Sequence, residues 1–540
     1  MDYQAHWRGR ERFVIFDSSW DDGASFAGWL AQWRADPDRP ARLHVIALAH
    51  GDLPGFQRVL QIDDAVTLDL LHAPLEPALA QLAARIDAVY LHGVADPGFA
   101  RPLARLLAAD ATLHADGLNT AQQAALAATG WKFDPTGRSA RFATRKPVAP
   151  LPPAPERRAI VIGAGLAGAA ACERLCARGW QVTLVERHPQ AAMEASGNLA
   201  GITMPLLSKD DNIASRLSRA AFLFALGYWE KLGGVGAAIE GAGCGVLHVA
   251  KDAAHAELQA STAAARRLPP DYAQWFDRDR AAARFGSLAP HGAWLFPRGG
   301  WIRPASACQA MLDVCGLRLH QIFGAGSVTL ERAGDEWRVV DADGVTLAQA
   351  ATVILASGAS DLAQAACLPL VRVRGQVTHL AAQALPELGL VLCREAYVTP
   401  AAGGQRSVGA TYDADLDPTL RASSQHENLA RVRSMLEDAS IGEGAPLQGR
   451  VGFRSVAPDH LPLVGALPDC TSVLGAERLR ELPRQAGLYA LLGYASRGLT
   501  WAPLAAELLA ATLEGEPLPL EANLAAALDP GRFRLRARRG

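Results

Sequence analysis

Short apolar runs alternate with longer runs of helical spacing in the first part of the chain. Residues 13–16, 43–48 and 88–91 are apolar, as expected for strands buried in a sheet, and residues 24–33 and 74–86 have the spacing of amphipathic helices. Strands and helices that alternate over short connections predict an α/β domain with a largely parallel sheet. Ligands of such a domain lie at the carboxyl ends of its strands.

A proline-rich stretch follows this region. Residues 146–158 contain five prolines, and proline can neither continue a helix nor pair inside a central strand, so these residues favour an extended spacer. We therefore expect one domain over residues 1–146, a linker over residues 147–156 and a second domain over residues 157–540.

The second region begins with a strand, a glycine-rich turn, an alanine-rich helix and a second strand, all within residues 159–186. Residues 337–348 have the pattern of two strands joined by a hairpin turn at Asp343-Gly344. Other segments are rich in β-branched residues, and residues 501–513 have the pattern of an amphipathic helix. These patterns predict a second domain of mixed α and β structure.

Three glycines mark a candidate dinucleotide-binding turn. Gly163, Gly165 and Gly168 form a GxGxxG pattern directly after an apolar strand and at the start of a helix. In this motif the glycines allow a tight turn, close approach of the backbone to a pyrophosphate and close packing of helix on strand. Glu186 ends the second strand, where a carboxylate binds ribose hydroxyls and repels the 2′-phosphate of NADP. The pattern predicts FAD or NAD, and a glycine-rich turn without a ligand is the alternative.

The loop after Glu186 favours FAD over NAD. It contains small and polar residues suited to close contact with a long cofactor, namely Ser196, Gly197, Asn198 and Gly201. Flavoproteins of the amino-acid-oxidase type have a similar loop beneath the pyrophosphate. FAD is therefore the predicted cofactor.

Composition narrows the class of protein. A chain of 540 residues, 50% of them hydrophobic and 20% charged, is typical of a folded protein with two or three domains. The charged N-terminus and the lack of a long apolar run predict a cytoplasmic protein that does not bind membranes. Eight scattered cysteines, with no CxxC pair and no histidine cluster, predict buried thiols and no metal site.

Charge alone does not identify a nucleic-acid partner. The formal net charge of -2 argues against a protein that coats nucleic acid. The C-terminus is nevertheless basic, because it contains Arg532, Arg534, Arg536, Arg538 and Arg539. This tail is either a solvated charged segment or a local contact for a polyanion.

The second region resembles a known family. Residues 195–211, which read ASGNLAGITMPLLSKDD, are similar to the oxidase domain of the bifunctional tRNA 5-methylaminomethyl-2-thiouridine biosynthesis proteins. Further similar stretches follow in the family's order, at residues 296–304, 353–360, 374–380, 397–400, 452–465 and 493–511. Together these stretches extend over essentially all of residues 157–535.

The resemblance implies an α/β protein whose two domains have different folds. Residues 1–146 would form a degenerate Rossmann-like methyltransferase domain. The rest would combine an FAD-binding Rossmann-type domain with a mixed or antiparallel-sheet substrate domain of the amino-acid-oxidase type. The FAD-binding parts are expected at about residues 157–240, 330–370 and 450–530, and the substrate parts at about residues 241–329 and 371–449.

The resemblance also implies an activity. The family's oxidase removes the carboxymethyl group from 5-carboxymethylaminomethyl(-2-thio)uridine at the tRNA wobble position, and dioxygen reoxidises the flavin. Two alternatives remain open on sequence grounds. The chain could be a flavin oxidase of a free small amine such as glycine, sarcosine or a D-amino acid, or a non-catalytic scaffold that binds flavin or tRNA.

Four residues are candidates for catalysis by resemblance. Arg454 would bind the substrate carboxylate, for which a bidentate guanidinium is suited, unless it forms a structural ion pair. Arg497 lies on the turn that approaches the flavin ring in such enzymes. Tyr397 would close the pocket or simply be a buried strand tyrosine, and Lys209 would promote reaction with oxygen or be a surface lysine.

Other residues are candidates for cofactor contact by resemblance. The turn before the last long helix would direct backbone N–H groups at the flavin's electron-rich edge, or serve only as a helix cap. The residues concerned are Arg187, Gly358, Gly493, Ser496, Gly498 and Leu499, with Arg497. One departure concerns substrate detail, because Ala457 and Pro458 stand where the family commonly has an arginine shortly before the motif DHLP.

The first domain has the features of a methyltransferase that has lost its chemistry. Ser19 and Asp21 stand where the resemblance predicts glycines, although Gly23 remains, and a side chain there occupies cofactor space. Ala49 and His92 stand where acidic residues are expected at the ends of two strands. We expect a non-catalytic remnant that does not bind S-adenosylmethionine. A shift of a few residues in the comparison would bring Asp17 or Asp52 to these positions.

Overall fold

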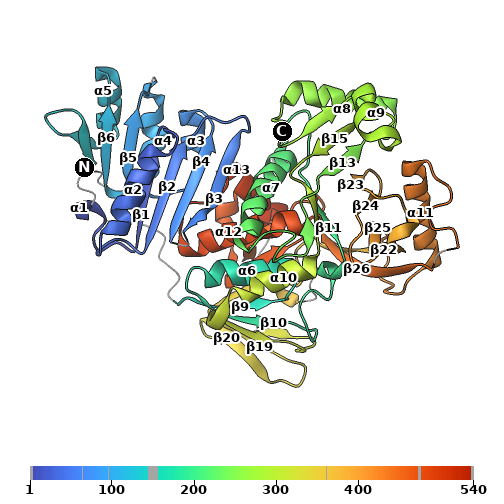
Figure 1. The fold of residues 1–540 in the computed structure, drawn as a ribbon. Coiled ribbons are helices and arrows are strands. Elements are labelled where there is room, and N and C mark those ends of the chain that lie inside the picture. Colours follow the sequence, from blue (N-terminus) through green and yellow to red (C-terminus); the bar gives the residue numbers. More distant parts are fainter. Residues whose placement is uncertain are drawn as a thin grey trace. The chain divides into compact units, whose positions relative to one another are not determined.

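The computed structural model describes residues 4–63, 65–94, 96–143, 156–359, 362–444, 446–471 and 476–536. They form two compact units, which we call unit 1 (Met1–Pro155 with Glu507–Ala526) and unit 2 (Glu156–Ala506 with Ala527–Gly540) (Figure 1). Most of the predicted linker, together with Arg538 and Arg539, lies outside the described residues. Within the described ranges, no helix is both long enough and apolar enough to cross a membrane.

Unit 1 contains an eight-stranded sheet in the order β3-β4-β2-β1-β5-β6-β8-β7. The strands β4, β2, β1, β5 and β6 are parallel, whereas β3 and β8 are antiparallel to their neighbours. The strands are β1 (Arg12–Asp17), β2 (Arg42–Leu48), β3 (Gly55–Asp63), β4 (Val66–His72), β5 (Ile86–His92), β6 (Leu107–Asp116), β7 (Trp131–Phe133) and β8 (Ser139–Phe142). The helices are α1 (Gln4–Trp7), α2 (Ala24–Ala35), α3 (Leu75–Gln81), α4 (Ala100–Ala104) and α5 (Thr120–Ala128).

Strand β1 shows why both faces of this sheet are covered. Phe13 and Ile15 belong to one buried cluster, and Val14 and Phe16 belong to another. Successive side chains of a strand point to opposite faces, so an unbroken apolar run is buried on both. The predicted strands β1, β2 and β5 and the predicted helix α2 are confirmed.

Two parts of unit 1 differ from the expected pattern. The helix predicted over residues 74–86 ends at Gln81, because Leu82 is extended and Ile86 already begins β5. Strands β3 and β4 were not predicted, since Arg58 and Asp69 interrupt their apolar pattern. Both side chains are buried, and they neutralise each other in an ion pair of 2.8 Å.

Unit 1 also contains a segment from the C-terminal part of the chain. Residues Glu507–Ala526 comprise the second part of α12 (Gly498–Glu514) and most of α13 (Ala522–Leu528). Glu507 Oε1 lies 2.7 Å from Arg58 Nη1, and both side chains are buried. Sequence patterns alone had placed this segment with the second domain.

Unit 2 contains a six-stranded sheet in the order β17-β10-β9-β21-β28-β27, parallel except for β27. An antiparallel meander, β18-β19-β20, follows β17 in the chain and includes the predicted hairpin. These strands are β9 (Arg158–Ile162), β10 (Gln181–Val185), β17 (Leu319–Ile322), β18 (Thr329–Ala333), β19 (Glu336–Val340), β20 (Thr346–Ala350), β21 (Thr352–Leu355), β27 (Leu463–Pro468) and β28 (Arg484–Leu492). The helices α6 (Leu166–Cys176) and α10 (Pro304–Asp313) pack against each other.

A second large sheet of unit 2 has the order β14-β15-β13-β23-β24-β25-β22-β26 and one parallel pair, β13–β23. Its strands are β13 (Val246–Val249), β14 (Gln274–Phe276), β15 (Ala293–Phe296), β22 (Val371–Ala381), β23 (Val391–Cys393), β24 (Tyr397–Val398), β25 (Gln405–Gly409) and β26 (Gln448–Val456). A small sheet contains β11 (Gly201–Thr203), β16 (Gly300–Ile302) and β12 (Gly241–Ala242). The remaining helices are α7 (Ile213–Lys231), α8 (Ala253–Arg266), α9 (Arg278–Phe285) and α11 (Ala422–Leu436).

Different elements pack on the two large sheets of unit 2. Helix α11 packs on β22 and β25 and lies along the outer side of the second sheet in Figure 1. The meander β18-β19-β20 contributes Trp337 and Val339 to the core of the first sheet. The predicted fold class is confirmed, since a Rossmann-type parallel sheet is combined with a mixed, mostly antiparallel one.

The cysteines correct one expectation. Cys367 and Cys470 form a disulfide across 103 residues of sequence, whereas the scattered spacing had predicted thiols. Spacing cannot reveal a pair that only the tertiary fold brings together. Of the other six, Cys244 and Cys393 are half-buried and four are buried.

Candidate functional site

A cavity of about 920 Å³ lies within unit 2. Both large sheets contribute to its lining, because Gly163 follows β9 of the parallel sheet and Arg454 belongs to β26 of the other. The turn before α12 supplies a third part of the wall. A cavity of this size at the carboxyl ends of parallel strands is the usual position of a cofactor.

The glycine turn is packed too closely for any side chain. Gly163 has φ +105°, and a Cβ there would lie 2.8 Å from the carbonyl oxygen of Ala356. A Cβ at Gly168 would collide with the carbonyl oxygen of Gly163, so Gly168 brings α6 against β9 rather than lining the cavity. Gly165 lines the cavity and precedes the first residue of α6, whose N-terminal N–H groups favour an anion.

Glu186 is held in place at the end of β10. Its Oε2 accepts a hydrogen bond of 2.6 Å from Ala164 N, and its Oε1 accepts one of 3.0 Å from His188 N. Each carboxylate oxygen keeps further acceptor capacity, and Glu186 lines the cavity beside Arg187. The side chain can therefore bind ribose hydroxyls without losing the contacts that orient it.

The loop after Glu186 is fixed by a residue that sequence reasoning missed. Arg450 donates to Met193 O at 2.6 Å and to Asn198 Oδ1 at 3.2 Å. Its guanidinium also fills the space beside Gly197, where a Cβ would collide with it. A signal was available, because Arg450 lies four residues before Arg454 and side chains at even spacing share one face of a strand.

Three buried hydroxyl groups around the cavity have no hydrogen-bond partner among the residues that the structure describes. They belong to Ser357, Ser455 and Tyr494, and all three residues line the cavity. Buried polar groups in native proteins are almost always paired. A cofactor with many oxygen and nitrogen atoms, such as FAD, would fit these groups as well as the glycine turn and Glu186.

Arg454 faces the cavity from β26. Its Nη1 donates to Thr411 O at 3.0 Å, and its Cζ lies 5.6 Å from the ring centre of Tyr412. A Cβ at Gly375 would collide with the guanidinium, so this glycine leaves room for it. No described residue forms an ion pair with Arg454. The alternative prediction was that Arg454 forms a structural ion pair. No acidic partner for it is found among the residues described.

Arg497 lies on the turn that precedes α12. Its Nη1 approaches Met204 O at 3.4 Å, and burial lowers the pKa of its guanidinium. Gly493 and Ala495 adopt positive φ in this turn, at +74° and +49°. Ser496, Gly498 and Leu499 line the cavity, and the N–H groups of a helix's first turn have no partner within the helix.

The remaining predicted residues divide between the cavity and the surface. Tyr397 lines the cavity, and burial raises the pKa of its hydroxyl to about 12, so the group stays protonated at neutral pH. Ser196, Gly201 and Gly358 also line it. Lys209 does not, because it is exposed in the turn before α7.

In unit 1, the strand ends that would hold a methyltransferase cofactor carry a different set of residues. Asp17 ends β1, and burial raises the pKa of its carboxyl to about 6. His92 ends β5 with its Nε2 3.8 Å from Asp17 Oδ1, and the buried Ala49 follows β2. The described residues contain no group of three or more histidine, cysteine or acidic side chains that could hold a metal ion.

Comparison with protein families identifies one match over most of the chain. A family described as FAD dependent oxidoreductase matches residues 158–512. The chain is 41% identical to the tRNA 5-methylaminomethyl-2-thiouridine biosynthesis bifunctional protein MnmC of Azoarcus sp. (strain BH72), over 99% of this chain and 92% of that protein. It is 40% identical to the protein of the same name from Burkholderia thailandensis, over 100% and 93%.

Solved structures show the same fold for unit 2. Glycine oxidase from Geobacillus kaustophilus matches with a TM-score of 0.58 and 21% identity, over 69% of this chain and 99% of that protein. Iminodiacetate oxidase from Chelativorans sp. BNC1 matches with a TM-score of 0.53 and 24% identity, over 67% and 96%. At such identities the likeness concerns the fold alone.

Proposed function

The chain belongs to the family of the bifunctional tRNA 5-methylaminomethyl-2-thiouridine biosynthesis proteins MnmC and is an FAD-dependent oxidoreductase, and we propose that it oxidises an amine on the wobble uridine of tRNA. FAD would lie in the cavity of unit 2, with its pyrophosphate at the turn of Gly163 and Gly165 and its ribose at Glu186. The unpaired hydroxyls of Ser357, Ser455 and Tyr494 support this position.

The proposed reaction removes the carboxymethyl group from 5-carboxymethylaminomethyl(-2-thio)uridine. Bound FAD would accept the hydride that leaves the C–H bond beside the amine nitrogen. The nitrogen loses its proton, and water hydrolyses the resulting C=N bond to the aminomethyl uridine and glyoxylate. Dioxygen takes up the two electrons and two protons and leaves as hydrogen peroxide.

Arg454 and Arg497 would bind negative charge at two different places, on the substrate and on the flavin. Arg454 uses one N–H on Thr411 O, and its remaining N–H groups would hold the substrate carboxylate, which fixes the distance from that carboxylate to the reacting C–H bond. Arg497, with the N–H groups of Gly498 and Leu499, would lie at the flavin's electron-rich edge and stabilise negative charge there. Tyr397 keeps its proton and can donate a hydrogen bond to the substrate.

One observation supports this assignment most strongly. The same cavity is lined by a dinucleotide turn and by two arginines that form no ion pair with any described residue. A guanidinium without a carboxylate partner in a half-buried site is costly, and an anionic ligand offsets that cost.

The reaction is tested by incubating the purified protein with tRNA that carries the carboxymethylaminomethyl base and analysing the digested nucleosides by mass spectrometry. We expect the carboxymethyl group to be lost and glyoxylate to accumulate. Unchanged tRNA together with turnover of free glycine or sarcosine would favour the small-amine oxidase instead. Purified protein without a flavin spectrum would contradict both.

We also propose that unit 1 has no methyltransferase activity. Ser19 and Asp21 replace glycines expected for cofactor approach, and Ala49 and His92 replace expected acids. Adding S-adenosylmethionine to the same assay should leave the aminomethyl product unchanged. Formation of methylaminomethyl uridine would contradict this part of the proposal.

A further inference from the structure

An exposed aromatic side chain lies beside Arg454. Tyr412 is 55% exposed, and no other phenylalanine, tyrosine or tryptophan is exposed among the side chains that the structure describes. Its ring centre lies 5.6 Å from Arg454 Cζ. Because large aromatic side chains are normally at least half-buried, an exposed one next to a cavity wall indicates a binding role.

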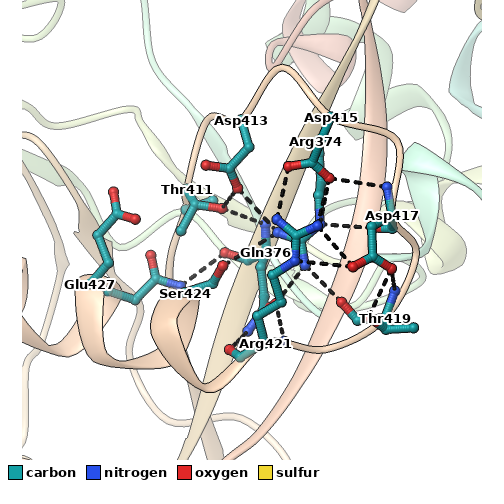
Figure 2. Close-up of polar contacts among 12 residues, drawn as sticks. Arg374, Gln376, Thr411, Asp413, Asp415, Asp417, Thr419, Arg421, Ser424 and Glu427 are labelled. Atoms are coloured by element: carbon teal, nitrogen blue, oxygen red, sulfur yellow. Dashed lines mark hydrogen bonds and ion pairs between the residues drawn. The ribbon is translucent and has the colours of Figure 1, made fainter.

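Tyr412 belongs to a loop, residues 411–421, between β25 and α11. Arg374, which is 0% exposed, holds this loop. Figure 2 shows its guanidinium among the polar groups of the loop. Its guanidinium donates to Asp417 O at 2.8 Å, to Thr419 O at 2.7 Å and to Asp413 Oδ2 at 3.1 Å. A buried guanidinium that donates several hydrogen bonds to one loop fixes the conformation of that loop.

The acidic residues of this loop are already neutralised. Asp413 pairs with Arg374, and Arg421 pairs with both Asp415 and Asp417 at 2.8 Å (Figure 2). These aspartates therefore repel an anionic substrate less than their number suggests. Pro418 of the same loop lines the cavity, so the loop forms part of the cavity's edge.

The loop is also tied directly to the proposed carboxylate site. Thr411 O accepts the hydrogen bond from Arg454, and Thr411 Oγ1 donates to Asp413 Oδ2 at 3.0 Å. The contacts thus run from the buried Arg374 through Asp413 and Thr411 to Arg454. Tyr412 follows Thr411, so its backbone position is set by the same contacts.

We propose that Tyr412 stacks on the pyrimidine ring of the substrate and so selects an amine attached to a base. This inference rests on the proposed function. The carboxyl carbon of the substrate is four bonds from the ring, so single bonds of about 1.5 Å place the two roughly 5 Å apart. A carboxylate on Arg454 therefore brings the base into the neighbourhood of Tyr412. The rest of the tRNA must extend to solvent, where Tyr412 is exposed.

The test compares Tyr412 variants of the FAD-loaded protein on two substrates, the nucleoside 5-carboxymethylaminomethyluridine and N-methylglycine, which lacks a base. Dioxygen uptake gives kcat and KM. Stacking on an aromatic side chain contributes about fivefold to hundredfold in affinity. We expect Tyr412→Ala to raise KM for the nucleoside by this factor with little change in kcat. The reason is that stacking would stabilise the bound substrate and the transition state equally. KM for N-methylglycine should rise much less, and Tyr412→Phe and Tyr412→Trp should retain nucleoside binding.

Leu416→Ala is the matched control, because Leu416 is 56% exposed on the same loop and should leave both KM values unchanged. If Tyr412→Ala and the wild type have equal KM values for the nucleoside, Tyr412 does not stack on the base. That result would leave the proposed function standing. A wild type that oxidises N-methylglycine but not the nucleoside or the tRNA would overturn the proposed function, and this inference with it.

Discussion

Glu186 illustrates how one side chain can serve both the fold and the cofactor. Its two oxygens already accept hydrogen bonds from Ala164 N and His188 N. Glu186→Ala should weaken FAD binding by about tenfold to hundredfold, since a hydrogen bond to a charged group contributes about 1.5–3 kcal/mol. Fluorescence titration of the flavin-free protein with FAD measures this. Glu331→Ala, an exposed site on β18, is the control, and an unchanged Kd for Glu186→Ala would remove the ribose role.

His248 makes stability depend on pH. Burial, with His255 and Arg497 nearby, lowers the pKa of its imidazole from 6.5 to about 4. Between these values the unfolded chain binds a proton that the folded protein does not, so stability is lost as the pH falls from about 6.5 towards 4. The loss attributable to this group between pH 7 and pH 5 is about 2 kcal/mol.

Thermal unfolding of His248→Gln at these two pH values tests the effect. The midpoint of the variant should fall less on acidification than that of the wild type. His426→Gln, at an exposed position on α11, should behave like the wild type. An identical acid shift in His248→Gln and the wild type would contradict this assignment.

Most of the residues predicted for the site line the cavity, but the residues that support them were not predicted. Gly163, Gly165 and Glu186 could be predicted because the motif has fixed spacing along the chain. The spacing of Arg450 from Arg454 offered a signal that was missed, whereas the hydroxyls of Ser357 and Ser455 could not be predicted, since only the tertiary fold brings them to the cavity. Lys209 is exposed and does not line the cavity, which agrees with the alternative prediction of a surface lysine.

At the scale of elements, the loop between β25 and α11 depends on one buried charge. Arg374→Met would remove the donor that the carbonyl groups of Asp417 and Thr419 share, and would leave Asp413 with Thr411 Oγ1 as its side-chain donor. Only Arg374 of this pair is buried, since Asp413 is 30% exposed, so the main cost is the loss of the hydrogen bonds that the buried guanidinium donates. We expect a lower unfolding midpoint and faster proteolysis within residues 411–421.

Arg421→Met is the matched comparison, because Arg421 pairs with two aspartates of the same loop but is 32% exposed. Its loss should lower the unfolding midpoint much less, because solvent-exposed ion pairs contribute little to stability. Equal effects of the two variants would show that burial of Arg374 does not set the loop's stability.

The elements themselves show where sequence patterns suffice. Strands β1, β2 and β5 are apolar on both faces and were predictable from periodicity. Strands β3 and β4 were not, because Arg58 and Asp69 are buried as a pair, and neither residue reveals its partner in the sequence. The disulfide between Cys367 and Cys470 escaped prediction for the same reason.

At the scale of the whole molecule, each compact unit contains two separate segments of the chain. Unit 1 takes Glu507–Ala526 from the C-terminal part of the chain, and Arg58 pairs with Glu507 in its interior. The helix α12 therefore begins at the cavity wall with Gly498 and ends within unit 1. We infer that unit 1 is incomplete when the chain is cut at the proline-rich linker, because Glu507–Ala526 then stays with the C-terminal fragment.

We propose that the amine on the tRNA base is the electron donor. Anaerobic mixing of the FAD-loaded protein with tRNA carrying the carboxymethylaminomethyl base tests it in a single turnover, followed by flavin absorbance. This tRNA should bleach the flavin, and the same tRNA without the modification should not. A flavin that stays oxidised with the modified tRNA but is bleached by sarcosine or glycine would contradict it.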